Sequence, residues 1–247
     1  MDTTTTSAPL LHLHPAFRLA GAAVFAVAAA LLHNPLVALC GCVPAFALLP
    51  FSGFGKKKAL RRLLATNGFV LFLWATVPWT YPGQTLLSLG PLTITREGVM
   101  ICLLVTLKAN AIMAAFMALA GTIPPHRMGH ALQRLGLPSK VCALVAFTSR
   151  YIDTLAQEYA TMRTAAILRG FTPRTSLSSY RTFAWLTGML LVRSSERSQR
   201  VYEAMRCRGF NGTFHSLDTH TPGRPDTLFM AAALLVSMTL LAADHLM

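Results

Sequence analysis

The chain has 247 residues, of which 53% are hydrophobic and only 13% are charged. A soluble domain carries about 25% charged residues, and the mean hydropathy here is +0.49, so the composition excludes a soluble enzyme and indicates an integral membrane protein. The net charge of +13 would suggest nucleic-acid binding in a soluble protein, but basic cytoplasmic loops account for it in a membrane protein. The five cysteines are scattered and odd in number, which predicts no disulfide framework.

Five apolar runs, each close to the ~20 residues that a spanning helix needs, predict an all-α integral membrane protein with about five transmembrane helices. The runs cover residues 17–32, 36–51, 63–81, 99–120 and 227–243. Asn34-Pro35 is a turn dipeptide, so we expect the first two spans to form a tight hairpin. Before the fourth span, the Gly90-Pro91 turn and the alternation in residues 92–95 indicate a short extended stretch.

Basic residues set the expected orientation in the membrane. Residues 56–62 hold five positive charges in seven positions, which marks a cytoplasmic loop. Counting spans outward from this loop puts the N-terminus in the cytoplasm and the C-terminus outside. It also puts residues 122–226, with 14 of the 22 basic residues, in the cytoplasm. Lys108, inside the fourth span, is expected to snorkel or to face other helices. The expected organisation is a polar tail (1–16), spans one to four (17–121), a cytoplasmic helical domain (122–226) and span five (227–247).

The cytoplasmic segment predicts three helices, over residues 124–135, 139–169 and 180–208. The second carries an apolar stripe spaced three and four residues apart, as on one face of an amphipathic helix. Its members are Ile152, Leu155, Tyr159, Met162 and Ala166. In the third helix several arginines fall near one face, and Glu196 is placed for a favourable i,i+4 pair with Arg200.

Both long helices end in the same pattern, Leu168-Arg169-Gly170-Phe171 in one and Cys207-Arg208-Gly209-Phe210 in the other. Arg in the last turn followed by Gly and an apolar residue is a helix C-terminus signal, because Gly takes the left-handed conformation without a Cβ penalty. We expect Phe171 and Phe210 to fold back on the preceding turns. The two arginines also fit docking, since a guanidinium is always charged and can contact a carboxylate in bidentate fashion. Two such ends, 39 residues apart, suit a partner with two equivalent grooves.

Residues for catalysis or metal binding are not apparent. The sequence has no Asp-rich motif, phosphate-binding loop or His-Glu-x-x-His motif, so we expect no nucleotide hydrolysis and assign no catalytic, cofactor-binding or metal-binding residue. Lys108 is the main ionisable residue assigned to the spans, which argues against a free-standing ion carrier. His126 and His130 share a predicted helix face, but no third ligand lies nearby in sequence, so solvated or lipid-facing histidines are favoured. His12 and His14 make a weaker metal site still.

Over nearly its whole length the chain resembles the transmembrane (T) component of energy-coupling-factor (ECF) transporters, the CbiQ/EcfT type, in its cobalt/nickel branch. The resemblance rests on His14-Pro15-Ala16-Phe17-Arg18-Leu19, Thr95-Arg96-Glu97-Gly98, Ile123-Pro124, Arg134-Leu135-Gly136-Leu137-Pro138, Ser149-Arg150-Tyr151-Ile152 and both Arg-Gly-Phe ends. In that family, Ala-Arg-Gly or Ala-Arg-Ser motifs end the coupling helices. Carried over by position, the resemblance implies ATPase-docking residues Leu168, Arg169, Gly170, Cys207, Arg208 and Gly209. Leu168 and Cys207 replace the motif's Ala, and His14 replaces a common Asp and is given no role.

The resemblance implies a non-catalytic scaffold in the bacterial cytoplasmic membrane, with residues 122–226 as its coupling-helix domain. Two ABC ATPase subunits would bind the ATP, and a separate substrate-binding membrane subunit of the cobalt/nickel M type would bind the metal. No cofactor is then expected on this chain. The partners would also include membrane lipid, with a small accessory membrane subunit left open and no nucleic acid.

Three alternatives stay open at this point. The chain could be the T component of a vitamin-type ECF importer, since the metal branch rests on general likeness. A membrane-embedded enzyme acting on an anionic lipid would need a motif that the sequence does not reveal. The permease half of an ordinary ABC importer predicts a single Glu-Ala-Ala-type loop, which two separate Arg-Gly ends fit poorly.

Overall fold

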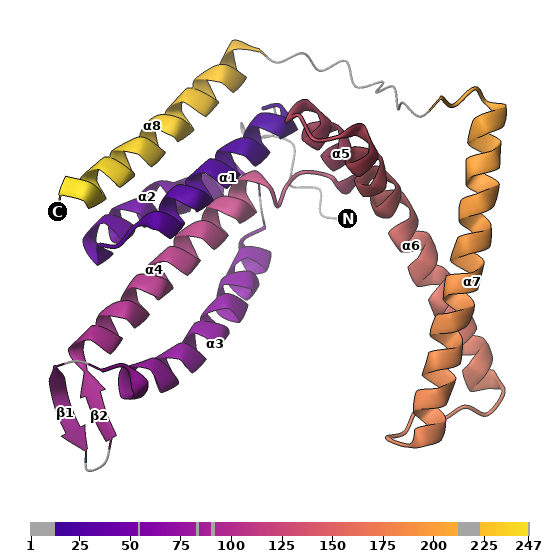
Figure 1. Cartoon of the computed structure of the whole chain (residues 1–247), viewed down its shortest axis with the longest axis horizontal. Helices are drawn as coiled ribbons and strands as arrows, with labels where there is room; N and C mark the ends of the chain where they lie inside the picture. Colours follow the sequence, from indigo (N-terminus) through magenta and orange to yellow (C-terminus); the bar gives the residue numbers. More distant parts are fainter. Residues whose placement is uncertain (1–12, 54, 83, 90–91, 212–222, 247) are drawn as a thin grey trace. The chain divides into compact units, whose positions relative to one another are not determined.

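The structure is a computed structural model that describes residues 13–53, 55–82, 84–89, 92–211 and 223–246 (Figure 1). Most of the polar tail expected at residues 1–16, with His12, lies outside the described residues. The chain divides into two compact units. Unit 1 joins Met1–Pro124 to His220–Met247, and unit 2 is Pro125–Thr219.

Unit 1 is built from apolar helices. They are α1 (Pro15–Leu31), α2 (Pro35–Phe51), α3 (Lys56–Thr80), α4 (Arg96–Leu119) and α8 (Arg224–Leu246). Among the described residues, α3, α4 and α8 are long and apolar enough to cross a membrane. The other two helices are apolar but have only 17 residues each. The protein is therefore a helical membrane protein, in which three of the five predicted spans meet the length of a spanning helix.

Helices α1 and α2 begin in the same way, with a side-chain cap followed by proline. His14 Nδ1 accepts a hydrogen bond from Ala16 N at 3.1 Å, and Asn34 Oδ1 accepts one from Leu36 N at 3.3 Å. Proline suits the first helical position because its missing N–H would have no partner there. The break predicted at Asn34-Pro35 is confirmed, and the cap explains why α2 begins at Pro35. The two helices do not form the tight hairpin that was predicted, because α1 packs mainly against α8 and α4, and α2 packs mainly against α4.

Small side chains let the helices of unit 1 pack closely. Helix α1 contacts both α4 and α8, α2 packs against α4, and α3 packs against α4. The largest buried cluster is rich in alanine: Phe25, Ala29, Leu32, Val37, Ala38, Cys42, Ala45, Ala111, Ala114, Ala115 and Leu240. A Cβ added at Gly98 would lie only 2.9 Å from Pro78 Cα, so the start of α4 approaches the end of α3 closely. Membrane helices associate through such small-residue contacts, because burying apolar surface gains little when lipid surrounds it.

Polar side chains inside unit 1 find partners on neighbouring helices. Asn67 and Asn110 exchange two hydrogen bonds of 3.0 Å between α3 and α4. Lys108 Nζ donates to the carbonyl of Ala30, near the end of α1, at 2.8 Å. The expectation that Lys108 faces other helices is therefore confirmed.

A short β-hairpin joins α3 to α4. Strands β1 (Thr85–Leu89) and β2 (Leu92–Thr95) pair antiparallel, with Leu89 opposite Leu92. The extended stretch predicted at residues 92–95 is confirmed, and the hairpin departs from the all-α expectation. Thr95 then caps α4, because its hydroxyl accepts from Gly98 N at 3.3 Å.

Unit 2 contains the three predicted helices, α5 (Pro125–Arg134), α6 (Ser139–Leu168) and α7 (Leu177–Cys207). Helix α5 ends at Arg134, and two residues later Gly136 has a φ of +85°, which the absence of a Cβ favours. Helix α7 begins three residues before the predicted start. The reason is Ser176, whose hydroxyl caps the helix by accepting from Ser179 N.

Candidate functional site

Helices α6 and α7 form an antiparallel hairpin that is held by ion pairs and by aromatic contact. Glu158 on α6 lies 3.7 Å from Arg193 and 3.2 Å from Arg197, both on α7. At the hairpin turn, the rings of Phe171 and Phe183 meet edge to face, with centroids 5.6 Å apart. The two long helices thus run in opposite directions, and their C-terminal ends lie at opposite ends of the hairpin (Figure 1).

The predicted apolar stripe of α6 is only partly packed. Met162 is 8% exposed, and Leu155, Tyr159 and Ala166 are half-buried. Ile152 is 58% exposed, so only part of the stripe is buried within unit 2. The spacing of three and four residues predicted which face of α6 is apolar. It could not show how far along α6 helix α7 covers that face.

Both Arg-Gly-Phe ends are closed by the same hydrogen-bond pattern. Gly170 has φ +90°, its N–H donates to Ile167 O at 2.9 Å, and Phe171 N donates to Ala166 O at 3.1 Å. Gly209 has φ +80°, and the equivalent bonds are 3.0 Å each, to Arg206 O and Met205 O. These are Schellman motifs, in which the two residues after the helix satisfy its last carbonyls. The capping predicted at both ends is confirmed.

The caps leave the arginines facing outward. Arg169 and Arg208 are the C-cap residues, with nearly identical backbone angles, and both side chains are exposed. The residues before them are exposed as well, Leu168 to 83% of its surface. At 1.5 Å per residue, the 31 residues of α7 separate the two ends by about 45 Å. The site residues predicted from sequence therefore form two separate, similar exposed ends on one hairpin, and their docking role stays a prediction.

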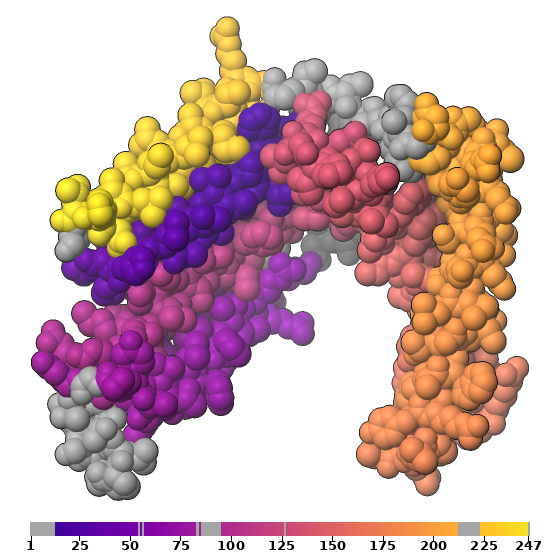
Figure 2. Space-filling view, in the orientation of Figure 1, coloured from indigo at the N-terminus to yellow at the C-terminus, as the bar shows by residue number. Residues whose placement is uncertain are grey.

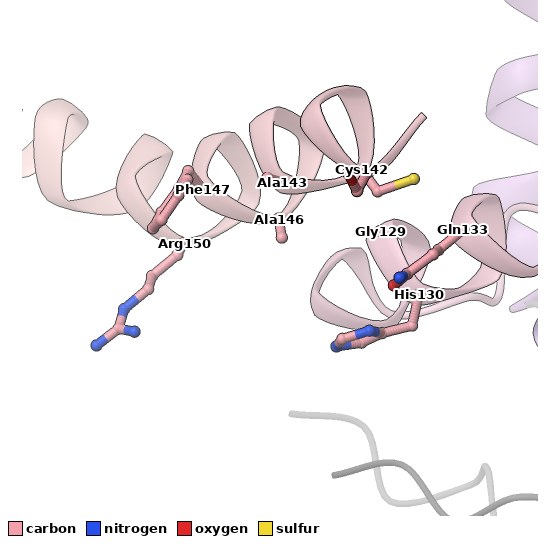
Figure 3. Close-up of a pocket in the computed structure, with 9 residues that line it drawn as sticks. Gly129, His130, Gln133, Cys142, Ala143, Ala146, Phe147 and Arg150 are labelled. Carbon is pink, nitrogen blue, oxygen red and sulfur yellow. The ribbon is translucent and has the colours of Figure 1, made fainter. Parts of the chain in front are cut away.

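A cavity of about 210 Å³ lies between α5 and α6 (Figure 3). It is lined by Gly129, His130, Gln133, Ser139, Cys142, Ala143, Ala146, Phe147 and Arg150. His130 on α5 and Arg150 on α6 flank its open side, with Ala146 between them (Figure 3). The side chain of His126 lies outside the described residues. Over the side chains that the structure describes, no group of three His, Cys, Asp or Glu could hold a metal ion.

Buried polar residues at the start of α1 were missed by the sequence reasoning. His14, Arg18 and Asp226 are between 2% and 5% exposed. Asp226 Oδ1 accepts from His14 N at 2.7 Å, and Arg18 donates to the hydroxyl of Thr122. The sequence carries a signal for one of them, since Arg18 is a charged residue inside the first apolar run.

Comparison with known proteins places this helical membrane protein in a transport family. The family model for CbiQ, described as cobalt transport protein, matches residues 6–221. The cobalt transport protein CbiQ of Rhodobacter capsulatus is 27% identical over 166 residues, which cover 66% of this chain and 66% of that protein. The energy-coupling factor transporter transmembrane protein EcfT of Limosilactobacillus fermentum is 24% identical over 224 residues, or 86% of this chain and 82% of that protein. The chain belongs to the CbiQ cobalt transport protein family.

Proposed function

We propose that this chain is the transmembrane coupling subunit of an ECF-type ABC importer. In this role it passes the ATP-driven motion of an ATPase pair to a separate membrane subunit that binds the substrate, and it catalyses no reaction itself. The observation that carries the proposal is the pair of exposed Arg-Gly ends on one helical hairpin, closed by the same cap. The name of the EcfT relative supports it.

The six predicted residues dock the two ATPase subunits. Each end offers an exposed guanidinium that can contact an acidic groove rim in bidentate fashion. The rigid cap fixes the direction in which each arginine leaves its helix. An ATPase dimer has two equivalent grooves, which matches two equivalent ends. Leu168 and Cys207 then contribute exposed apolar surface beside each arginine.

All five apolar helices span the bacterial cytoplasmic membrane, with unit 2 in the cytoplasm. The 17 residues of α1 and of α2 are at the lower end of the ~17–25 residues seen in spanning helices. Helices α1 and α8 run parallel, because Asp226 bonds to the start of α1 and Asp244 bonds to its end. Both helices therefore begin on the same side of the membrane. Because α1 and α2 cross the membrane once each, α3 begins on that side too, and the Lys56–Lys58 cluster at its start marks the side as cytoplasmic. The C-terminal end of α8 is then outside.

The transported substrate is cobalt or nickel, held by the separate substrate subunit. The support is the description of the family and the name of the R. capsulatus relative. The T component of a vitamin-type importer is the second candidate, because the EcfT relative is matched over more of its length and its name gives no metal substrate.

Co-expression with an ABC ATPase pair and a candidate M-type subunit tests this proposal. We expect the three components to purify as one complex and to take up radiolabelled Co²⁺ into proteoliposomes only with ATP. A complex that forms without metal uptake but transports a vitamin would favour the second candidate. Purification of the chain without ATPase subunits, under conditions that keep it folded, would contradict the coupling role.

A further inference from the structure

Both segments that connect unit 1 to unit 2 are tied by hydrogen bonds to the first turn of α1. On the way into unit 2, Thr122 lies two residues before Pro124, the last residue of this part of unit 1. On the way back, Gly223 and Asp226 lie just after His220, where unit 1 resumes. All the bonds described here lie within unit 1.

The return segment is held by the buried carboxylate of Asp226. One of its oxygens accepts a hydrogen bond from the residue before α1, and the other accepts one from the residues just before α8. Asp226 Oδ1 accepts from His14 N at 2.7 Å, and Oδ2 accepts from Gly223 N at 2.9 Å. Asp226 is 4% exposed. Hydrogen bonds to a charged acceptor are roughly twice as strong as neutral ones. This carboxylate therefore links the residue before α1 to the segment that returns from unit 2.

The outgoing segment is held by a buried arginine. Arg18 is 2% exposed, and one of its terminal nitrogens donates to the Thr122 hydroxyl, while its Nε has no hydrogen-bond partner. An incompletely paired guanidinium is costly to bury, and charged residues in membrane segments mark functional positions by default. Arg18 lies one turn after His14, so both connections meet the same turn of α1.

The other end of α8 provides an internal comparison. Asp244 accepts from His33 N at 3.0 Å and from Asn34 N at 2.8 Å, which ties the end of α8 to the turn between α1 and α2. Helix α8 lies along α1 (Figure 2), and carboxylates near its two ends bond to the two ends of α1. Only the Asp226 end also holds a connection to unit 2.

We propose that Asp226 and Arg18 are positioning residues that clamp both connections to the start of α1. Motion of unit 2 that reaches Thr122 and Gly223 is then passed on to α1 and α8. The inference rests on the proposed coupling function, which supplies the motion. It assigns a purpose to the buried His14, Arg18 and Asp226, which docking alone does not need.

The test uses the complete complex with spin labels on α1 and α3, introduced as spin-labelled amino acids at the exposed positions Val27 and Phe69. Among the described residues no hydrogen bond joins α3 to Thr122, Gly223 or Asp226, so α1 should move relative to α3 and the label distance should shift when ATP is added. Asp226→Asn keeps one acceptor oxygen and loses the other, and Thr122→Val removes the acceptor of Arg18 with little change in shape. The matched controls are Asp244→Asn, at the other end of α8, and Thr122→Ser, which keeps the hydroxyl.

We expect the ATP-dependent shift to be largely lost in Asp226→Asn and in Thr122→Val, with ATP hydrolysis and complex assembly retained. The shift should stay within error of the parent in both controls. Equal loss in Asp244→Asn would overturn the inference, since it would show a general need for the α1–α8 contact. The inference would also be overturned if every variant kept the ATP-dependent shift of the parent complex. The same holds if the parent complex hydrolysed ATP without any change in label distance. If Thr122→Val does not assemble, the two Asp→Asn variants decide the question. Failure of the proposed function looks different, because the parent chain would then retain no ATPase.

Discussion

Two glycines decide how the proposed docking ends are presented. At Gly170 and Gly209 the backbone turns with φ near +90° and +80°, which lets the next amides satisfy the last carbonyls of the helix. The arginine before each glycine has a fixed backbone at the negative end of the helix dipole, which favours its positive charge. Cap and docking are therefore compatible, because the cap uses backbone groups and leaves the guanidinium exposed.

The cost of losing the cap can be separated from steric effects. A Cβ at Gly209 would meet no atom within 4 Å, so Gly209→Ala should destabilise the end of α7 by about 1 kcal/mol through backbone strain alone. Gly188 is the matched control, because it lies inside α7 with open space around it and without a positive φ. Gly188→Ala should instead stabilise α7 by about 0.5–1 kcal/mol. Hydrogen exchange of the α7 amides measures both changes in stability. If the two variants changed the stability of α7 in the same direction, the assignment of Gly209 as a cap residue would be contradicted.

At the scale of elements, the α6–α7 hairpin is held at few points. Besides the Phe171–Phe183 contact, Glu158 receives two arginines and is itself only 17% exposed in its side chain. Much of α7 is uncovered within unit 2, including Leu177, Tyr180 and Trp185 at its start. The hairpin therefore depends on a small number of polar contacts to hold α7 against α6.

Removing the central carboxylate should loosen this hairpin. In Glu158→Ala both arginines lose their partner, and we expect a loss of about 1–2 kcal/mol in the free energy that holds α7 against α6. Glu196→Ala is the control, since its i,i+4 pair with Arg200 lies at 3.9 Å and is largely exposed. That change should cost only a few tenths of a kcal/mol. Hydrogen exchange around Arg193 should rise in the Glu158→Ala variant alone, and equal rises in both variants would show that Glu158 does not hold α7 against α6.

Across the whole molecule, the sequence predicted the features that depend on neighbouring residues, which are helix caps, turns and apolar helices. Gly after Arg predicted both caps, Pro after a polar residue predicted the break between α1 and α2, and apolar runs predicted the helices of unit 1. The bonds between distant segments were not predictable. Asp226 meets His14 across 212 positions in the chain, and nothing in either neighbourhood indicates the other. Hydropathy also hid Arg18, because one charge in a long alanine-rich run barely changes the average.

Binding of an ATPase pair by the two Arg-Gly ends can be tested directly. Arg169→Ala combined with Arg208→Ala removes both guanidinium groups but keeps both capping glycines, so the chain should insert and fold normally. Its affinity for the purified ATPase pair should fall by about 30-fold or more, the loss expected when buried interface arginines are truncated. Arg163→Ala, an exposed arginine within α6, is the control and should bind like the parent. If the double variant bound the ATPase pair with unchanged affinity, the docking role of Arg169 and Arg208 would be contradicted.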